Sequence, residues 1–240
     1  AESADLVFSD IRHVSSGGDM IPATLLERCK DTFPNAEIWV IYGCTEIACM
    51  GTTWEVERST TTSTTYVGKT FEHSKVLLLN DSIPANIGEI GEVHFAGEGV
   101  TRGYLNRDDL NKSKFINVNG VRYYATGDFG IIDETGNLQL KGRKDFQIKI
   151  NGVRIETEEI EHWLNNVTGI AKSIVVGAKD VKGDLKIVAF IHGLSNFTLP
   201  DEPTIKQQLS ETIPDYMVPN KIYSLAEFPL NTNGKIDRNA

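Results

Sequence analysis

Two charged side chains next to Gly-containing turns could together hold a phosphorylated sugar. Asp128 follows the dipeptide Thr126-Gly127, and an ionised carboxylate on a tight turn can accept hydrogen bonds from two sugar hydroxyls. Arg143 follows Gly142, where the backbone can approach a ligand, and a guanidinium fork matches the geometry of a phosphate. Each has an ordinary alternative, because the aspartate could bond its own turn and the arginine could form a surface ion pair. The two together favour a polyanionic ligand with a sugar, such as a nucleotide.

A second candidate site is the segment Tyr42-Gly43-Cys44-Thr45-Glu46, which directly follows a predicted strand. The carboxyl ends of parallel strands are where α/β folds bind ligands. There a tyrosine ring can stack on a base, a threonine can donate to a phosphate, and a glutamate can bind a hard cation such as Mg²⁺. The alternative is a plain strand-to-helix turn in which Glu46 is a solvated acid.

A polar loop at residues 231–235 carries Lys235, which could act as a point charge on a phosphate or could be a solvated tail lysine. The five histidines show no metal-ligand spacing, and His13 is interpreted as a core residue of a strand. The sequence contains no complete phosphate loop and no Ser/His/Asp order. It therefore predicts phosphate-binding cations without a full phosphate cradle.

Composition limits the kind of protein. A length of 240 residues suits one large or two modest domains, and 40% hydrophobic residues are enough for a buried core. The net charge of −9 argues against a nucleic-acid partner, whose binding surface would be basic. The three cysteines form no CxxC pair, which favours reduced thiols in a cytoplasmic protein. No apolar run approaches the roughly 18 residues of a membrane span, so no membrane partner is predicted.

The elements that would position the Tyr42-Gly43-Cys44-Thr45-Glu46 segment form a parallel βαβ unit. Residues 11–16 and 37–41 are predicted to be short buried strands, and the segment between them is predicted to be a helix that stops before Pro34. After Val67 the pattern changes to short strands separated by turns, which is typical of an antiparallel or barrel-like section. Residues 58–66, rich in Thr and Ser, are predicted to be a loop or an edge strand.

A domain boundary is predicted near Lys144-Asp145, so that residues 1–144 and 145–240 form separate domains. The second domain is expected to be a compact α+β unit. It should contain a hairpin turning at Asn151-Gly152, helices at 156–167 and 204–212, strands at 171–178 and 185–192, and an irregular stretch over 216–240. Four acidic residues in the first turns of the 156–167 helix are interpreted as favourable to its dipole.

The motifs, in their order along the chain, resemble the adenylate-forming superfamily and specifically the adenylation domains of nonribosomal peptide synthetases. The segments that carry the resemblance are VSSGGDMIP, YGCTE, GEIGEVHFAGEGVTRGYLNRDDLNKSKF, RYYATGD, GRKDFQIKINGVRIETEEIE, IPDYMVP and LNTNGKIDR. They cover nearly the whole chain, and their order makes the resemblance far more specific than any one motif. The forms YMVP, NTNGKIDR and RGYLNR favour the peptide synthetase branch over acyl-CoA ligases and luciferases.

The resemblance implies the C-terminal part of a large subdomain, made of the βαβ piece and the barrel-like section, followed by a small α+β subdomain. It implies an enzyme that activates a small amino or carboxylic acid with ATP and Mg²⁺ as an acyl-adenylate. The acyl group would then pass to the phosphopantetheine thiol of a peptidyl carrier protein, in the biosynthesis of an antibiotic or other secondary metabolite. The small subdomain would rotate between the two half-reactions about a hinge at Asp145.

The resemblance also assigns roles to individual residues. Tyr42 would stack on adenine, Asp128 would hold the ribose hydroxyls, and Arg143 would contact the ribose and phosphate. Thr45 would touch the α-phosphate, and Glu46 would bind Mg²⁺. The remaining implied positions are Lys235 for catalysis of adenylation, Lys149 facing the cleft in the thioester-forming state, and a largely apolar substrate pocket at Val14, Ser16, Ile41, Cys49 and Met50.

The chain departs from the family pattern at its start. The family's Ser/Thr/Gly-rich phosphate loop and its amine-binding aspartate would both lie before Ala1, so the chain is expected to act with an N-terminal remainder of the adenylation domain. Val40, Cys44 and Leu140 stand where the family often has Asn, Pro and an aromatic residue. Two alternatives stay open: a fragment of an acyl-CoA ligase, and a non-catalytic scaffolding remnant of an adenylation domain.

Overall fold

The computed structural model describes residues 6–144, 146–232 and 236–238. The chain divides into two units, Ala1–Asp145 and Phe146–Ala240. Two residues of the sequence-based predictions, the hinge Asp145 and the catalytic Lys235, lie outside the described residues. No helix in the described part of the chain has the length and apolar character needed to cross a membrane.

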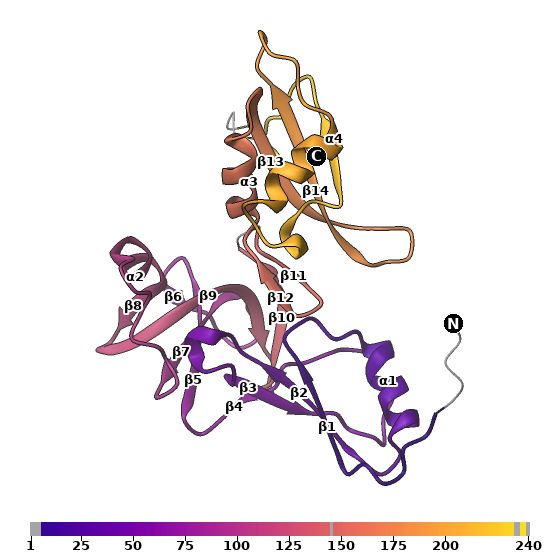
Figure 1. Ribbon diagram of the computed structural model, residues 1–240. Coiled ribbons are helices and arrows are strands. Elements are labelled where there is room, and N and C mark those ends of the chain that lie inside the picture. Colours follow the sequence, from indigo (N-terminus) through magenta and orange to yellow (C-terminus); the bar gives the residue numbers. More distant parts are fainter. Residues whose placement is uncertain (1–5, 145, 233–235, 239–240) are drawn as a thin grey trace. The chain divides into compact units, whose positions relative to one another are not determined.

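The first unit begins with the predicted strand-helix-strand arrangement (Figure 1). β1 (His13–Gly17) pairs in parallel with β2 (Glu37–Tyr42), and α1 (Ala23–Thr32) connects the two strands. The sheet continues with β3 (Thr52–Glu55) and β4 (Lys69–Thr70) in the order β1-β2-β3-β4. The 3₁₀ turn η1 (Thr45–Ile47) follows β2 directly, so the parallel strand ends at the candidate segment.

The prediction that β1 is a buried strand is wrong. Only Val14 is partly buried, because β1 is the edge of its sheet and no strand among the described residues covers its outer side. His13, predicted to belong to the core, is exposed and stacks on Trp39 with ring centroids 6.4 Å apart. Apolar residues alone cannot distinguish a central strand from an edge strand, because the pairing partners lie elsewhere in the chain.

The predicted antiparallel section is a six-stranded sheet with the order β10-β9-β7-β5-β6, in which β8 also pairs with β9. Its elements are β5 (Ser74–Asn80), β6 (Ile83–Pro84), β7 (Gly91–Gly97), α2 (Asp108–Lys114), β8 (Phe115–Val118), β9 (Val121–Ile132) and β10 (Leu138–Arg143). The fully buried side chains of Phe95, Tyr124 and Leu138 belong to an apolar cluster that also contains Ile38 and Val40 of the first sheet. Both sheets of the first unit therefore share one core.

The second unit is the expected α+β unit. Its elements are β11 (Ile148–Ile150), β12 (Val153–Ile155), α3 (Thr157–Asn165), β13 (Ile170–Lys179), β14 (Leu185–Gly193), α4 (Glu202–Ser210), η2 (Asp215–Met217) and β15 (Lys221–Ser224). Asn151 and Gly152 both have positive φ, as the turn of a two-residue hairpin requires. Ile160 and Leu164 of α3 are fully buried against the three-stranded sheet β13-β14-β15.

Two expectations for the second unit are corrected. Residues 216–240 are not wholly irregular, since β15 pairs in parallel with β14. This strand has only four residues, and Ile222 alone is buried. A segment this short is not recognised as a strand from alternation of apolar and polar residues. The second helix begins at Glu202 rather than Thr204, because Asp201 caps it by accepting the backbone N–H of Thr204 at 3.0 Å.

Candidate functional site

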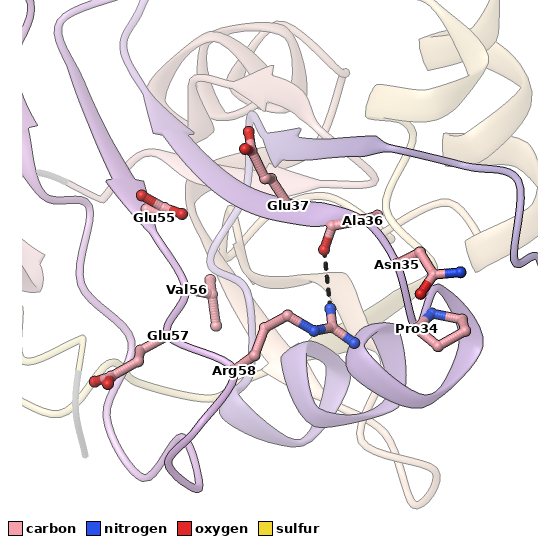
Figure 2. A pocket seen from close by; sticks show the side chains of 8 residues that line it. All are labelled: Pro34, Asn35, Ala36, Glu37, Glu55, Val56, Glu57 and Arg58. Carbon is pink, nitrogen blue, oxygen red and sulfur yellow. Dashed lines mark hydrogen bonds between the residues drawn. The ribbon is translucent and has the colours of Figure 1, made fainter.

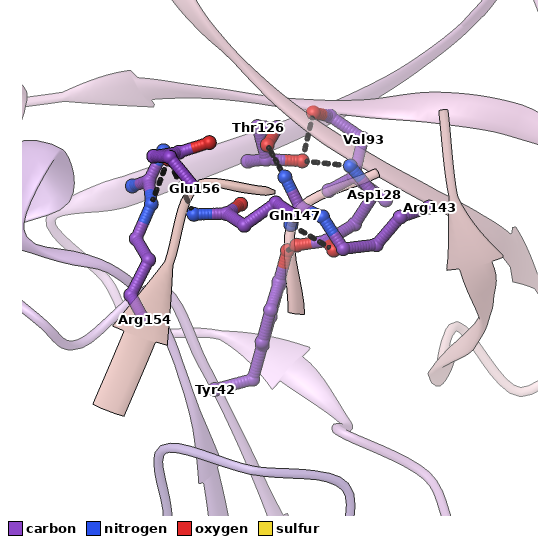
Figure 3. A network of polar contacts seen from close by, with 8 residues as sticks. All are labelled: Tyr42, Val93, Thr126, Asp128, Arg143, Gln147, Arg154 and Glu156. Carbon is purple, nitrogen blue, oxygen red and sulfur yellow. Dashed lines mark hydrogen bonds and ion pairs between the residues drawn. The ribbon is translucent and has the colours of Figure 1, made fainter. Parts of the chain in front are cut away.

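Three residues predicted to bind a nucleotide come together in the first unit (Figure 3). Arg143 Nη1 donates to Asp128 Oδ1 at 2.5 Å, and Tyr42 Oη donates to Asp128 Oδ2 at 2.5 Å. The side chains of Asp128 and Arg143 are 12% and 17% exposed. The ion pair is therefore nearly buried, in contrast to the surface pair that the sequence left open as an alternative.

A β-bulge places Arg143 opposite Asp128. On the hairpin side of the bulge, Leu140 faces Gly130, but the register shifts before Gly142, and Arg143 then faces Asp128. Without the extra residue, continued pairing from Leu140 would set Arg143 opposite Gly127. Gly142 has φ +118°, a conformation that L side chains rarely adopt, which explains the glycine at this point.

Thr126 supports the carboxylate from the same strand. Its Oγ1 donates to the carbonyl of Val93 at 2.8 Å and accepts the backbone N–H of Asp128 at 3.0 Å. Arg143 Nη2 donates to the carbonyl of Thr126 at 3.2 Å. Sequence reasoning treated this threonine only as part of a turn. Its position two residues before Asp128 was the available signal, because alternate strand residues share a face.

Tyr42 is a hydrogen-bond donor in this site. It is 6% exposed, and its ring centroid lies 5.8 Å from that of Phe95. Burial, together with the negative charge of Asp128, raises the pKa of the Tyr42 phenol well above its ordinary value. The hydroxyl therefore stays protonated at neutral pH and donates to the carboxylate. Stacking of this ring on a base stays a prediction.

Glu46 is not the solvated acid of the alternative interpretation. It is 6% exposed, and its Oε1 accepts the hydroxyl of Tyr104 at 2.5 Å. The Tyr104 and Tyr124 hydroxyls lie 3.3 Å apart, so Tyr104 links Glu46 to a second tyrosine. Tyr104 belongs to the RGYLNR segment, which sequence reasoning used only as a family marker. Thr45 begins the same 3₁₀ turn and is exposed.

The loop after β2 reverses tightly around Gly43. A Cβ at this position would fall 2.4 Å from the carbonyl oxygen of Cys49, so no other residue fits without a shift. Ala48 and Cys49 both adopt positive φ, and the backbone N–H of Cys49 donates to the carbonyl of Cys44 at 2.8 Å. The turn therefore folds back on itself and holds Glu46 inside while Thr45 faces outward.

The five residues of the predicted substrate pocket do not share one face of the sheet. Val14 pairs with Ile38 and Ser16 pairs with Val40, whereas Ile41 pairs with Gly17 and so points to the opposite face. The other two, Cys49 and Met50, are exposed beyond the 3₁₀ turn. The pocket assignment stays a prediction.

In the second unit, Lys149 lies on β11 opposite Arg154 and is partly buried. Glu156 Oε1 accepts from Gln147 Nε2 at 2.7 Å and from Arg154 Nε at 3.0 Å (Figure 3). Gln147 is itself buried. This cluster fixes the base of the hairpin that carries Lys149.

A hollow of about 450 Å³ elsewhere in the first unit contains none of the predicted site residues (Figure 2). It is lined by Pro34, Asn35, Ala36, Glu37, Glu55, Val56, Glu57 and Arg58. Arg58 donates to the carbonyls of Ala36 at 2.9 Å and Lys30 at 2.7 Å, so it caps the end of α1. The three glutamates make the lining repulsive to phosphates.

The described residues include no group of three or more His, Cys, Asp or Glu side chains placed to hold a metal ion. Mg²⁺ bound with a nucleotide needs only one or two protein carboxylates, because phosphates and waters complete its octahedron. The buried carboxylate of Glu46, next to the exposed Thr45, fits that requirement.

Profiles of known families match both units. The profile of AMP-binding enzymes matches residues 2–105, and that of the AMP-binding enzyme C-terminal domain matches residues 159–235. The sequence is 33% identical over 232 residues to bacitracin synthase 1 of Bacillus licheniformis, covering 95% of this chain and 4% of that protein. It is also 34% identical over 227 residues to the D-alanine–D-alanyl carrier protein ligase of Bacillus licheniformis, covering 92% of this chain and 45% of that protein.

The structure resembles the adenylation domain AlmE of Vibrio cholerae, solved in complex with glycyl-adenosine-5′-phosphate. The TM-score is 0.81 at 26% identity, covering 94% of this chain and 43% of that chain. The chain spans less than half the length of these relatives. The likeness confirms the predicted fold class, a C-terminal part of the adenylate-forming fold that includes the small subdomain.

Proposed function

Because the chain belongs to the AMP-binding enzyme family of nonribosomal peptide synthetase adenylation domains, we propose that it is part of an enzyme that activates a small amino or carboxylic acid with ATP. The family uses ATP, typically with Mg²⁺. In the proposed reaction, a carboxylate oxygen of the acid attacks the α-phosphorus of ATP, and pyrophosphate leaves. The thiol of a carrier protein then attacks the acyl carbon, and AMP leaves.

One observation carries the proposal: Tyr42 of β2 and Arg143 of β10 both donate to the Asp128 carboxylate of β9. That arrangement offers a carboxylate for ribose hydroxyls and a cation for phosphate side by side. Glu46 would hold Mg²⁺, whose charge would neutralise the phosphates. Lys235, which sequence resemblance alone brings into the proposal, would stabilise the negative charge that builds at the α-phosphate during attack.

Two further parts of the proposal concern partners. The chain would act together with an N-terminal remainder of the adenylation domain, which would supply the phosphate loop. The acyl acceptor would be a peptidyl carrier protein. The relatives support this acceptor, since one of them is named as a carrier protein ligase.

The test is acid-dependent exchange of pyrophosphate into ATP by the complete enzyme, which is this chain together with its N-terminal remainder. Lys235→Ala should lower exchange by about 10²-fold or more, as loss of one transition-state donor typically does. Lys221→Gln, which removes an exposed lysine of the same unit, is the matched control.

Unchanged exchange in Lys235→Ala would favour the scaffolding alternative instead. If exchange falls as expected, the acceptor decides between the two enzymatic alternatives. Transfer of the acyl group to a phosphopantetheinylated carrier protein supports the proposal, whereas transfer to free coenzyme A alone favours the acyl-CoA ligase.

A further inference from the structure

A nearly buried ion pair in the second unit ties the C-terminal segment to helix α3. Arg238 Nη1 and Nη2 donate to Glu161 Oε1 and Oε2 at 2.6 and 2.9 Å, and the two side chains are 13% and 10% exposed. Glu161 Oε1 also accepts the backbone N–H of Val175 on β13 at 2.7 Å. The guanidinium lies over the ring of Phe146, 4.2 Å from its centroid. These four residues are called the Arg238 clasp.

The clasp joins three places that matter in the proposed reaction. Phe146 is the first residue of the second unit and directly follows the predicted hinge. Arg238 lies three positions after the predicted catalytic lysine in the sequence. Glu161 lies on α3, and Val175 lies on β13 and belongs to the unit's core. The clasp therefore connects the start of the unit and its C-terminal segment to the same rigid core.

The backbone of the C-terminal segment is held a second time by its own hydrogen bonds. Ile236 forms an antiparallel bridge with Leu230, and the backbone N–H of Asp237 donates to the carbonyl of Pro229 at 2.9 Å. Residues 236–238 are thus fixed on both the backbone and the side-chain side. This anchored stretch begins one position after Lys235 in the sequence.

Stability alone is a poor explanation for such a pair. Desolvation offsets most of the attraction between two buried charges, so apolar residues of similar size would stabilise the unit as well or better. A bidentate fork under an aromatic ring does what apolar residues cannot, because it fixes both the position and the plane of the guanidinium.

We propose that Arg238 is a positioning residue for adenylation: the clasp sets the placement of the segment that carries Lys235 relative to the core of the second unit. This inference rests on the proposed function. In this proposal Arg238 does not contact ATP or the acid, and the residue affects the reaction only through Lys235. Small errors of placement suffice for large effects, since a misplacement of about 1 Å can cost on the order of 10² in rate.

The first experiment uses Arg238→Lys in the complete enzyme. Lysine keeps the charge beside Glu161 but lacks the planar fork. The expected result is a fall of about 10-fold or more in kcat for pyrophosphate exchange, with KM for ATP changed by less than about 3-fold, because an interaction felt only in the transition state lowers kcat alone. Phe146→Leu, which removes the ring but keeps an apolar cover, should shift kcat in the same direction. Lys221→Gln is the control and should leave kcat unchanged.

The deciding experiment combines Arg238→Lys with Lys235→Ala. If Arg238 acts only through the lysine, Arg238→Lys should have no further effect on pyrophosphate exchange in an enzyme that already carries Lys235→Ala. A general structural defect would instead lower exchange by the same factor in both backgrounds, and that result would overturn the proposal. So would an Arg238→Lys enzyme with wild-type kcat.

Hydrogen exchange keeps this inference separate from the proposed function and from misfolding. In Arg238→Lys the backbone amide of Asp237 should exchange faster, while the amides of α3 should exchange as in the wild type. If the Asp237 amide exchanges its hydrogen at the same rate in Arg238→Lys and in the wild type, the anchoring is contradicted directly, whatever the adenylation activity. If Lys235→Ala itself leaves pyrophosphate exchange unchanged, the proposed function fails, and the rate at Asp237 alone decides the anchoring.

Discussion

Each of the two units buries a pair formed by a carboxylate and a guanidinium. The two pairs differ in which groups donate to the two carboxylate oxygens. At Asp128 one oxygen accepts from Tyr42 and the other from Arg143. At Glu161 both oxygens accept from the same guanidinium, that of Arg238. The two carboxylates are similarly buried, at 12% and 10% exposure of the side chain, so burial does not account for the difference.

The division of the oxygens decides what each pair can do. A ligand can replace one partner of Asp128 and leave the other hydrogen bond in place, so the charge never lies unpaired. At Glu161 a ligand would have to open the whole fork and separate two nearly buried charges, leaving Glu161 only its hydrogen bond from the Val175 N–H, which is strongly unfavourable. The Asp128 pair therefore suits ligand binding, and the Glu161 pair suits holding the C-terminal segment on α3. The following predictions test this contrast.

The largest effect is expected at Glu161. Glu161→Ala leaves the Arg238 guanidinium nearly buried without its carboxylate, and it removes the acceptor of the Val175 N–H. Removing one partner of a buried pair typically costs about 3–5 kcal/mol of unfolding free energy. Denaturant unfolding followed by fluorescence of Trp163, which lies on α3, should report the loss.

Glu159→Ala on the same helix is the control, since Glu159 is exposed. It should change the unfolding free energy far less, because exposed charges near a helix start interact only weakly with the dipole. Equal losses in the two variants would mean that Arg238 finds another partner. The contrast between a closed fork and a divided carboxylate would then be wrong.

The next effect is expected at Asp128, where ligand binding should be lost along with stability. Asp128→Asn keeps the size of the side chain but removes its charge, and hydrogen bonds to charged groups contribute about 1.5–3 kcal/mol. In the complete wild-type enzyme, ATP at about 100 times its Kd should stabilise the fold by about 2.7 kcal/mol. Asp128→Asn should lose most of this stabilisation.

Glu161→Gln is the matched variant for this measurement, because it neutralises the other buried carboxylate. It should keep the stabilisation by ATP at saturating concentration even though its unfolding free energy is lower. If both variants lose the ATP effect equally, the Asp128 pair has no special role in binding. If neither loses it, the nucleotide binds elsewhere.

The sequence predicts best where a local pattern determines the structure. Asn151-Gly152 specifies a hairpin turn by its backbone conformation alone, and α3 follows from its apolar spacing. The convergence of Tyr42, Asp128 and Arg143 was expected from the resemblance, since each lies in a recognisable motif. Their hydrogen bonds to one another were not expected.

The sequence fails where a distant partner determines the structure. Gly142 alone does not specify the bulge that moves Arg143 opposite Asp128, because the bulge depends on the register with β9. Glu161 was interpreted as one of four acids that favour the helix dipole, yet its partner is Arg238, far along the chain. A buried acid and a solvated acid look the same in a helix until the residue that covers it is known.

The smallest effect, and the one with a pH signature, is expected at Tyr42. Tyr42→Phe keeps the ring next to Phe95 and removes one hydrogen bond to the Asp128 carboxylate, which still pairs with Arg143. It should therefore cost about 1.5 kcal/mol of unfolding free energy at neutral pH, the low end of the range for hydrogen bonds to charged groups. Burial and the Asp128 charge raise the phenol pKa in the folded state above its ordinary value near 10. The folded protein therefore holds this proton more tightly than the unfolded chain, and the resulting stability is present below about pH 10 and is lost as the pH rises above it.

The variant has no phenol at this position, so its stability should fall less steeply than that of the wild type above about pH 10. Unfolding followed in a Trp163→Phe background leaves Trp39 and Trp54 as reporters of the first unit. Tyr216→Phe, which alters an exposed tyrosine of the second unit, is the control. A difference between wild type and Tyr42→Phe that stays constant from about pH 8 to about pH 11 would mean that Tyr42 does not hold its proton against Asp128. The Asp128 carboxylate would then lack one of the two different donors that distinguish it from the Glu161 carboxylate, whose oxygens both accept from Arg238.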